Sequence, residues 1–306
     1  MTRFCIDFSQ PFALLAMCLT VTAASSQADE LREHGFADSD GVRIHYVTAG
    51  EGPLVVMIHG FPDFWYTWRN QMPQLAKNFK VVAIDQRGYN QSDRPKGVEN
   101  YAAEKLVGDV QAVVQHHGAE KAIIVGHDWG GMVAWMFAMS HPEMTERLVV
   151  LNLPHPVGMT RELMHNPAQQ AASAYARFFQ QPDAYKTLNA QALAVWVKDK
   201  AAQPKYIEAF ERSSFESMLN YYKANYPKPP FKESQQNYSK ISCPVLIIHG
   251  LNDTALMAAG HNSVWEQVDN EVTLLMVPNA GHFVQQDVSS KVTRTIDQWL
   301  RQDELK

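Results

Sequence analysis

The chain has 306 residues, of which 46% are hydrophobic and 19% are charged, and its formal net charge is −5. This composition excludes an intrinsically disordered chain, a collagen-like repeat and a coiled coil, and the lack of a basic excess argues against a nucleic-acid partner. Three cysteines in a chain of this length also exclude a disulfide scaffold.

The first 28 residues have the pattern of a secretory signal peptide. Arg3 gives a weakly positive start, residues 11–24 are uncharged and largely apolar, and cleavage after Ala28 fits the small-x-small rule. The apolar run is shorter than the roughly 20 residues needed to span a bilayer. The alternatives are a buried N-terminal helix, which the lack of alternating faces disfavours, and a lipoprotein anchored through Cys18. We expect an exported protein, periplasmic or secreted, with Cys243 as its only cysteine and no stable membrane anchor in the mature chain.

Short apolar runs that alternate with helical stretches predict an α/β fold. Residues 42–47 alternate as a half-buried strand. Runs that are nearly continuous in Val, Ile and Leu, typical of parallel strands buried on both faces, follow at residues 54–59, 81–85, 122–127, 148–152, 245–249 and 272–277. Helical periods lie between them, as at 101–117 and 132–140. We expect a doubly wound, mostly parallel sheet whose site lies beyond the carboxyl ends of the strands.

The alternation of strand and helix breaks between residues 155 and 240. This stretch is rich in Ala, Gln, Tyr and Phe, is interrupted by prolines, and has no strand-like run of comparable strength. The simplest account is a helical lid inserted into one α/β core. The expected organisation is a signal peptide at 1–28, a first part of the core at 29–154, the lid at 155–240 and a second part of the core at 241–306.

The sharpest motif is Gly-x-Asp-x-Gly, which follows an expected strand and precedes an expected helix. In that context it predicts a nucleophile elbow, in which Gly126 and Gly130 permit a strained turn that lifts Asp128 clear of the sheet. An aspartate that caps the helix explains the motif about as well, but the strand–turn–helix context favours a functional role. A carboxylate is anionic at neutral pH and can displace a leaving group from saturated carbon, which forms an alkyl ester of the enzyme.

Cleavage of such an ester by water requires a general base. Elbow enzymes have the chain order nucleophile, acid, histidine, and Asp253 and His282 complete this order, each just after an expected strand. Asp253 is expected to hold the imidazole tautomer of His282, so that its other nitrogen deprotonates water. The expected oxyanion-hole donors are the backbone N–H groups of Phe61, in the turn after residues 54–59, and of Trp129.

Together these motifs resemble the epoxide hydrolase branch of the α/β-hydrolase fold family, which is related to haloalkane and haloacetate dehalogenases. The resemblance spans roughly residues 35–300 and is carried by four motifs, at 59–62 (His-Gly-Phe-Pro), 85–93 (Asp-Gln-Arg-Gly-Tyr-Asn-Gln-Ser-Asp), 126–131 (Gly-His-Asp-Trp-Gly-Gly) and 281–283 (Gly-His-Phe). The family usually has glycine where this chain has Asn90. Asparagine tolerates positive φ better than most residues, so we expect the turn to be kept.

The resemblance implies two lid tyrosines that hydrogen-bond the epoxide oxygen. The Asn-aromatic-Tyr-basic stretch at 220–223 assigns one role to Tyr222, with Tyr221 as the alternative register. The stretch that ends in Phe-Gln-x-Pro assigns the other role to Tyr175. A phenol is a suitable acid for a developing alkoxide, although most aromatic side chains of a lid only pack.

The resemblance implies hydrolysis of a small apolar epoxide to a vicinal diol, with water as co-substrate and with no metal or organic cofactor. The nearest alternative is a haloalkane or haloacetate dehalogenase, which shares the aspartate nucleophile. Phe61 stands where haloalkane dehalogenases often have Asn, and Trp129 stands where fluoroacetate-type relatives have Arg. A non-catalytic binding protein on the same fold is disfavoured because every catalytic position is filled. The sequence predicts no particular oligomeric state.

Overall fold

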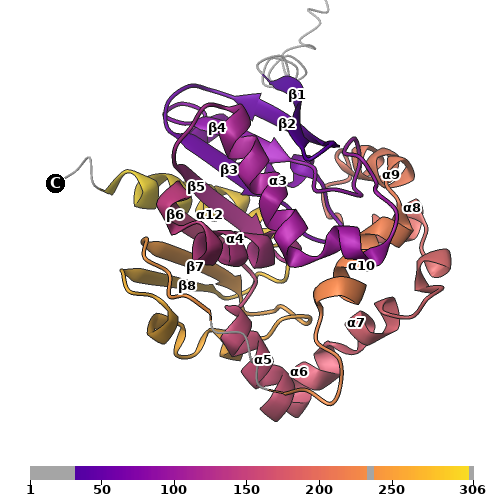
Figure 1. The fold of residues 1–306 in the computed structure, drawn as a ribbon. Coiled ribbons are helices and arrows are strands. Elements are labelled where there is room, and N and C mark those ends of the chain that lie inside the picture. The colour runs from indigo at the N-terminus through magenta and orange to yellow at the C-terminus, as the bar shows by residue number, and fades with distance from the viewer. Residues whose placement is uncertain (1–31, 233–237, 303–306) are drawn as a thin grey trace, which may run out of the picture. The chain divides into compact units, whose positions relative to one another are not determined.

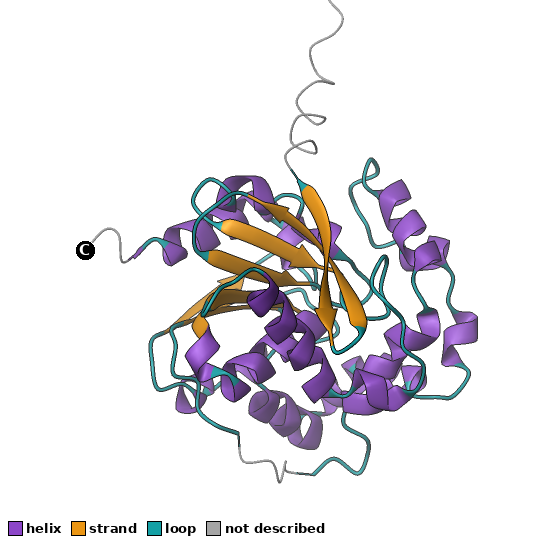
Figure 2. Ribbon diagram, turned by 45° about the horizontal axis from the view of Figure 1, so that its top comes forward, coloured by secondary structure: helices purple, strands orange, loops and turns teal. Residues whose placement is uncertain are grey.

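A computed structural model describes residues 32–232 and 238–302 of the chain, so the expected signal peptide at 1–28 lies outside the described residues. From Glu33 onward the chain forms an eight-stranded sheet with the strand order β1-β2-β4-β3-β5-β6-β7-β8 (Figure 1). Helices pack on both faces of this sheet, as Figure 2 shows. The predicted α/β class is therefore confirmed.

All seven predicted strand positions hold a strand. Strands β3 to β8 pair only in parallel with one another, whereas β2 joins β4 in antiparallel orientation. The sheet is therefore mostly parallel, as predicted. The seven strands are β2 (Val42–Ala49), β3 (Leu54–Ile58), β4 (Lys80–Ile84), β5 (Ala122–His127), β6 (Thr145–Leu151), β7 (Val245–Gly250) and β8 (Val272–Val277).

One strand, β1 (Glu33–Ser39), is absent from the sequence prediction. It forms a hairpin with β2 through a two-residue turn in which Asp40 and Gly41 have φ of 56° and 82°. Asp-Gly is a strong signal for such a turn, because both central residues must adopt positive φ. The strand was missed because most of its side chains are exposed, so no apolar run marks it.

The central strands are buried on both faces because consecutive side chains enter two different hydrophobic clusters. In β3, Val56 and Ile58 join one cluster, while Val55 and Met57 join the other. Helices α3 (Ala103–His116) and α4 (Trp129–Ser140) contact the sheet and each other, and α12 (Ser289–Leu300) contacts β7 together with α2 (Met72–Leu75) and α11 (Val284–Asp287). Strand β8 differs from the expectation of burial on both faces, because it is an edge strand with several exposed side chains.

Every element that the structure describes between β6 and β7 is helical. We call α5 to α10 the helical segment, and prolines begin two of its helices: Pro156 and Pro167 lie at the first positions of α5 and α6. Within the described residues, no helix is both long and apolar enough to cross a membrane. The helices are α5 (Pro156–His165), α6 (Pro167–Ala172), α7 (Ala174–Phe179), α8 (Ala190–Leu193), α9 (Gln203–Arg212) and α10 (Phe215–Asn225).

Several contacts join the helical segment to the loops at the strand ends. Asn90 has φ of 42°, as expected for a residue that replaces glycine, and its side-chain oxygen accepts a hydrogen bond of 2.8 Å from Arg212. At a second point, the ring of Trp196 stacks on that of Phe283, with centroids 3.4 Å apart and an interplanar angle of 5°. Because Phe283 follows His282 directly, the second contact lies beside the predicted catalytic base.

Candidate active site

Asp128 occupies the sharp turn between β5 and α4 with φ of 51° and ψ of −120°. This backbone conformation is rare for a residue with a side chain, and the close packing around the turn enforces it. A Cβ atom on Gly60 would collide with the Asp128 side chain, and one on Gly126 or Gly130 would collide with neighbouring backbone. The elbow therefore depends on these three glycines, two of which the motif had identified.

The turn after β3 directs a backbone donor at this carboxylate. The Phe61 N–H donates to Asp128 Oδ1 at 2.8 Å. His59 stabilises the turn because its Nδ1–H donates to the Gly60 carbonyl at 2.8 Å and its Nε2 accepts from the Gln86 N–H at 3.0 Å. Burial lowers the pKa of His59, which is consistent with the neutral tautomer that these two bonds require. The second expected donor, the N–H of Trp129, starts helix α4 directly after Asp128.

His282 lies between two carboxylates. Its Nδ1 is 2.8 Å from Asp253 Oδ2, and its Nε2 is 3.5 Å from Asp128 Oδ2. Burial by itself lowers the pKa of His282, but the negative charges of Asp253 and Asp128 and the contacts with both outweigh burial and raise it to about 10. The structure thus brings together the three residues that the sequence predicted as nucleophile, acid and base.

The same ionic contacts keep the two carboxylates charged. Burial favours the neutral form of Asp128, but its hydrogen bond to His282 and the charge of that ring hold the pKa of Asp128 below its ordinary value. Burial also opposes ionisation of Asp253, and the charge of His282 with several hydrogen bonds again holds its pKa low. In the free site Asp128 and Asp253 are therefore anionic at neutral pH, and His282 carries a proton.

Two further residues that support His282 were not predicted from the sequence. Asn152 follows β6 with φ of 48° and donates its amide to Asp253 Oδ2 at 2.8 Å. His127, the last residue of β5, donates from Nε2 to the carbonyl of His282 at 2.8 Å. Both are polar residues at the carboxyl end of a buried strand, and that position is the signal by which they could have been found.

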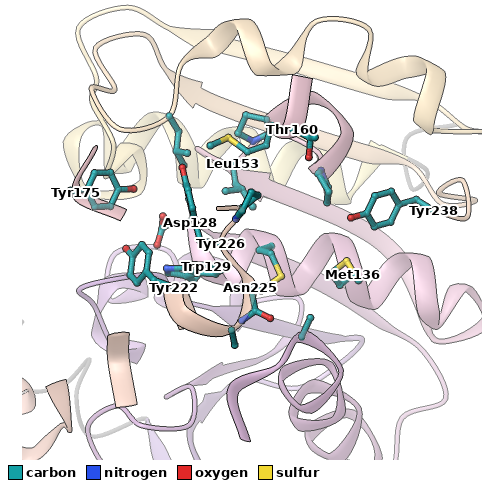
Figure 3. Close-up of a pocket in the computed structure, with 18 residues that line it drawn as sticks. Asp128, Trp129, Met136, Leu153, Thr160, Tyr175, Tyr222, Asn225, Tyr226 and Tyr238 are labelled. Atoms are coloured by element: carbon teal, nitrogen blue, oxygen red, sulfur yellow. The ribbon is translucent and has the colours of Figure 1, made fainter. Parts of the chain in front are cut away.

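The two predicted tyrosines face Asp128 across a cavity of about 320 Å³ (Figure 3). Tyr175 comes from α7 and Tyr222 from α10, and their ring centroids are 6.0 Å apart. Tyr221 points elsewhere, because its hydroxyl donates to the carbonyl of Arg87 at 2.9 Å and it does not line the cavity. The structure therefore favours the register that places Tyr222 in the site.

Tyr175 and Tyr222 are both protonated at neutral pH. Burial, together with the negative charge of Asp128, raises the pKa of Tyr175 and of Tyr222 well above the ordinary value. The Trp129 ring meets Tyr222 edge to face, with centroids 4.9 Å apart. The site thus combines an anionic carboxylate with two phenol donors on the opposite wall, and most of the remaining lining is apolar.

A parallel sheet with an acidic elbow residue, followed by an acid and a histidine at later strand ends, defines the α/β hydrolase class. The model of the α/β hydrolase fold family matches residues 53–287. Among curated proteins, epoxide hydrolase 1 of Caenorhabditis elegans is 36% identical over 85% of this chain and 68% of its own length. Epoxide hydrolase 4 of Homo sapiens is 32% identical over 87% of this chain and 78% of its own length.

Solved structures agree with these relatives. The crystal structure of an epoxide hydrolase of Bacillus megaterium in complex with an inhibitor has a TM-score of 0.82 and 31% sequence identity, and the match covers 87% of this chain and 100% of that one. The chain belongs to the α/β hydrolase fold family and, within it, to the epoxide hydrolase branch.

Proposed function

We propose that this enzyme hydrolyses an epoxide to a vicinal diol through a covalent ester on Asp128. The observation that carries the proposal is the pair of protonated phenols, Tyr175 and Tyr222, on the wall opposite an anionic carboxylate. An epoxide oxygen leaves as an alkoxide and needs hydrogen-bond donors and then a proton, whereas a halide leaves without one. The membership in the epoxide hydrolase branch supports the same substrate class.

In the first half of the reaction, Asp128 attacks one ring carbon from the side opposite the oxygen. Its Oδ1 is held by the Phe61 N–H, so Oδ2, which lies 3.5 Å from His282 Nε2, is the oxygen that forms the new bond. The C–O bond of the ring breaks, and Tyr175 and Tyr222 stabilise the released oxygen. The released oxygen takes up one proton to become an alcohol. His282 gives up the proton that it carries before the reaction, so the site as a whole neither gains nor loses a proton.

Formation of the ester prepares the second half of the reaction. It removes the negative charge of Asp128, which is one cause of the raised pKa of His282. With its proton gone, His282, held by Asp253 at 2.8 Å, takes a proton from water, and the hydroxide attacks the carboxyl carbon. The Phe61 and Trp129 N–H groups stabilise the oxyanion, the diol leaves, and Asp128 and the protonated His282 are restored.

The proposal is tested with a panel of epoxides and haloalkanes of matched carbon skeleton. Diol and halide are assayed separately with the purified protein. We expect diol formation from epoxides, with haloalkanes far slower because the wall opposite Asp128 carries phenols. Release of halide without formation of any diol would replace this proposal with the dehalogenase alternative.

Substitution of Tyr222 by phenylalanine is expected to lower kcat/KM for epoxides by roughly 10²-fold or more, because a donor to the leaving oxygen is lost. Tyr221→Phe is the matched control, since it removes a hydroxyl from the neighbouring position that bonds Arg87 and not the cavity. Both rates are normalised to folded protein by circular dichroism. A larger loss in Tyr221→Phe than in Tyr222→Phe would reverse the assignment of the acid.

We also propose that the helical segment acts as a lid and that the protein is exported. The first proposal rests on the origin of Tyr175 and Tyr222, which both come from this segment and line one cavity with Asp128 of the core. The second rests only on the composition of residues 1–28, which lie outside the described residues.

A further inference from the structure

The cavity is chemically different at its two ends. Asp128, Tyr175 and Tyr222 lie together at one end, whereas Met136 and Tyr238 lie at the other (Figure 3). Among the described residues that line the cavity, Asp128 alone is charged, and no lysine, arginine or histidine is present. A substrate that extends along the cavity can therefore place its reacting group beside Asp128 and another of its functional groups beside Tyr238.

Most polar groups of the wall between these ends are already committed to the protein. The Asn225 amide donates to the carbonyls of Tyr101 and Tyr221, at 2.8 and 3.0 Å. The Tyr226 hydroxyl donates to Ser173 Oγ at 2.8 Å. The middle of the cavity therefore offers a substrate mainly methionine, leucine, proline and tryptophan side chains.

Two hydroxyls toward the end of the cavity that holds Tyr238 form no hydrogen bond to another described residue. Thr160 of α5 and Tyr238 line the cavity, both are half-buried, and neither hydroxyl has a hydrogen-bond partner among the described residues. The Tyr238 ring is held edge to face against the buried His155, with centroids 5.9 Å apart. Because both side chains are only half-buried, water can satisfy these hydroxyls, and a polar ligand group can replace that water without loss of hydrogen bonding, whereas an apolar group cannot.

We propose that the substrate is an epoxide with an apolar spacer and a neutral hydrogen-bonding group at its far end, which Thr160 and Tyr238 receive. The inference rests on the proposed epoxide hydrolysis and extends it to a substrate class. A neutral group such as a hydroxyl is favoured over a carboxylate, because no cation lines this cavity within the described residues and Asp128 already supplies a negative charge. Thr160 and Tyr238 would thus determine specificity without taking part in the chemistry.

The test uses terminal epoxides in a series of chain lengths, each made with a methyl, a hydroxyl or a carboxylate at the end remote from the ring. At the matching length we expect kcat/KM to be about three- to tenfold higher for the hydroxyl than for the methyl compound per hydrogen bond formed, with the carboxylate poorest. Thr160→Val, Tyr238→Phe and the double variant are expected to remove this preference. For the methyl compounds, which offer no hydrogen bond to these hydroxyls, the same variants should change kcat/KM by a smaller factor than for the hydroxyl compounds.

The outcomes separate this inference from the proposed function. If no epoxide is opened, the proposed function itself fails. If methyl and short epoxides are hydrolysed but the hydroxyl compound is not preferred at any length, only the inference about the far end is overturned. A hydroxyl preference that survives in Thr160→Val, in Tyr238→Phe and in the double variant overturns it as well, because other residues must then bind the terminal hydroxyl of the substrate.

Discussion

Asp128→Asn is expected to reduce epoxide turnover by roughly 10⁴-fold or more, which is the scale seen when a nucleophile is removed. The amide is uncharged and cannot form the alkyl ester, while its size preserves the contact with the Phe61 N–H. Diol formation under saturating substrate gives kcat, and intact-protein mass spectrometry shows whether a covalent adduct forms. Turnover near the wild-type rate without an adduct would exclude Asp128 as the nucleophile.

Two further variants make this result specific. The asparagine introduced by Asp128→Asn can revert to aspartate by deamidation, so the mass is checked after assay and Asp128→Ala, which cannot revert, is measured in parallel. Asp63→Asn is the matched control, since Asp63 is also fully buried but does not line the cavity. Burial raises the pKa of Asp63 to about 7, so a neutral amide suits its surroundings, and turnover should be retained.

The second large effect is expected for His282→Gln, which should slow diol release by about 10²- to 10⁴-fold through loss of the general base. Attack by the carboxylate and donation by the phenols do not require His282, and solvent can supply the proton that this residue gives in the wild type, so the variant should accumulate one adduct per chain. Intact mass should rise by the mass of one epoxide, and peptide mapping should place the increase on Asp128. A burst of epoxide consumption equal to the enzyme concentration would accompany it.

The pH of this experiment matters. In the wild type, the hydrogen bond and charge of His282 lower the pKa of Asp128 against the effect of burial, so their loss raises that pKa. A raised carboxylate pKa means that the nucleophile is fully ionised only at higher pH, and adduct formation should therefore be followed from about pH 6 to about pH 9. Loss of turnover with no adduct at any pH would show that His282 acts before the ester forms.

The sequence predicted those parts of the fold that an apolar run can encode. Strands such as β3 and β5 are continuous in aliphatic residues because both of their faces are buried, and all six continuous runs form strands, as does the alternating run at 42–47. The outer strand β1 has no such run, and only its Asp-Gly turn marks it. The positions of Asp128, Asp253 and His282 were predictable because strand ends of a parallel sheet meet at one edge.

The parts of the site that depend on how the helices pack on the core could not be predicted from strand positions. Adjacent residues on a helix point roughly 100° apart, so either Tyr221 or Tyr222 could have faced the cavity. The choice follows from how α10 lies on the core, where the Tyr221 hydroxyl meets the Arg87 carbonyl. Asn152 was not predicted for a similar reason, because its contact with Asp253 joins residues that are 101 positions apart in the chain.

The proton that His282 shares with two carboxylates has a consequence for side reactions. A serine hydrolase of this fold keeps a neutral histidine ready and attacks any ester that fits its pocket. Here an ester that is merely bound leaves Asp128 charged, so His282 stays protonated and water is not activated. Only an ester built on Asp128 itself removes that restraint. On the proposed mechanism, the charge of Asp128 would therefore protect foreign esters from hydrolysis even where they fit the cavity.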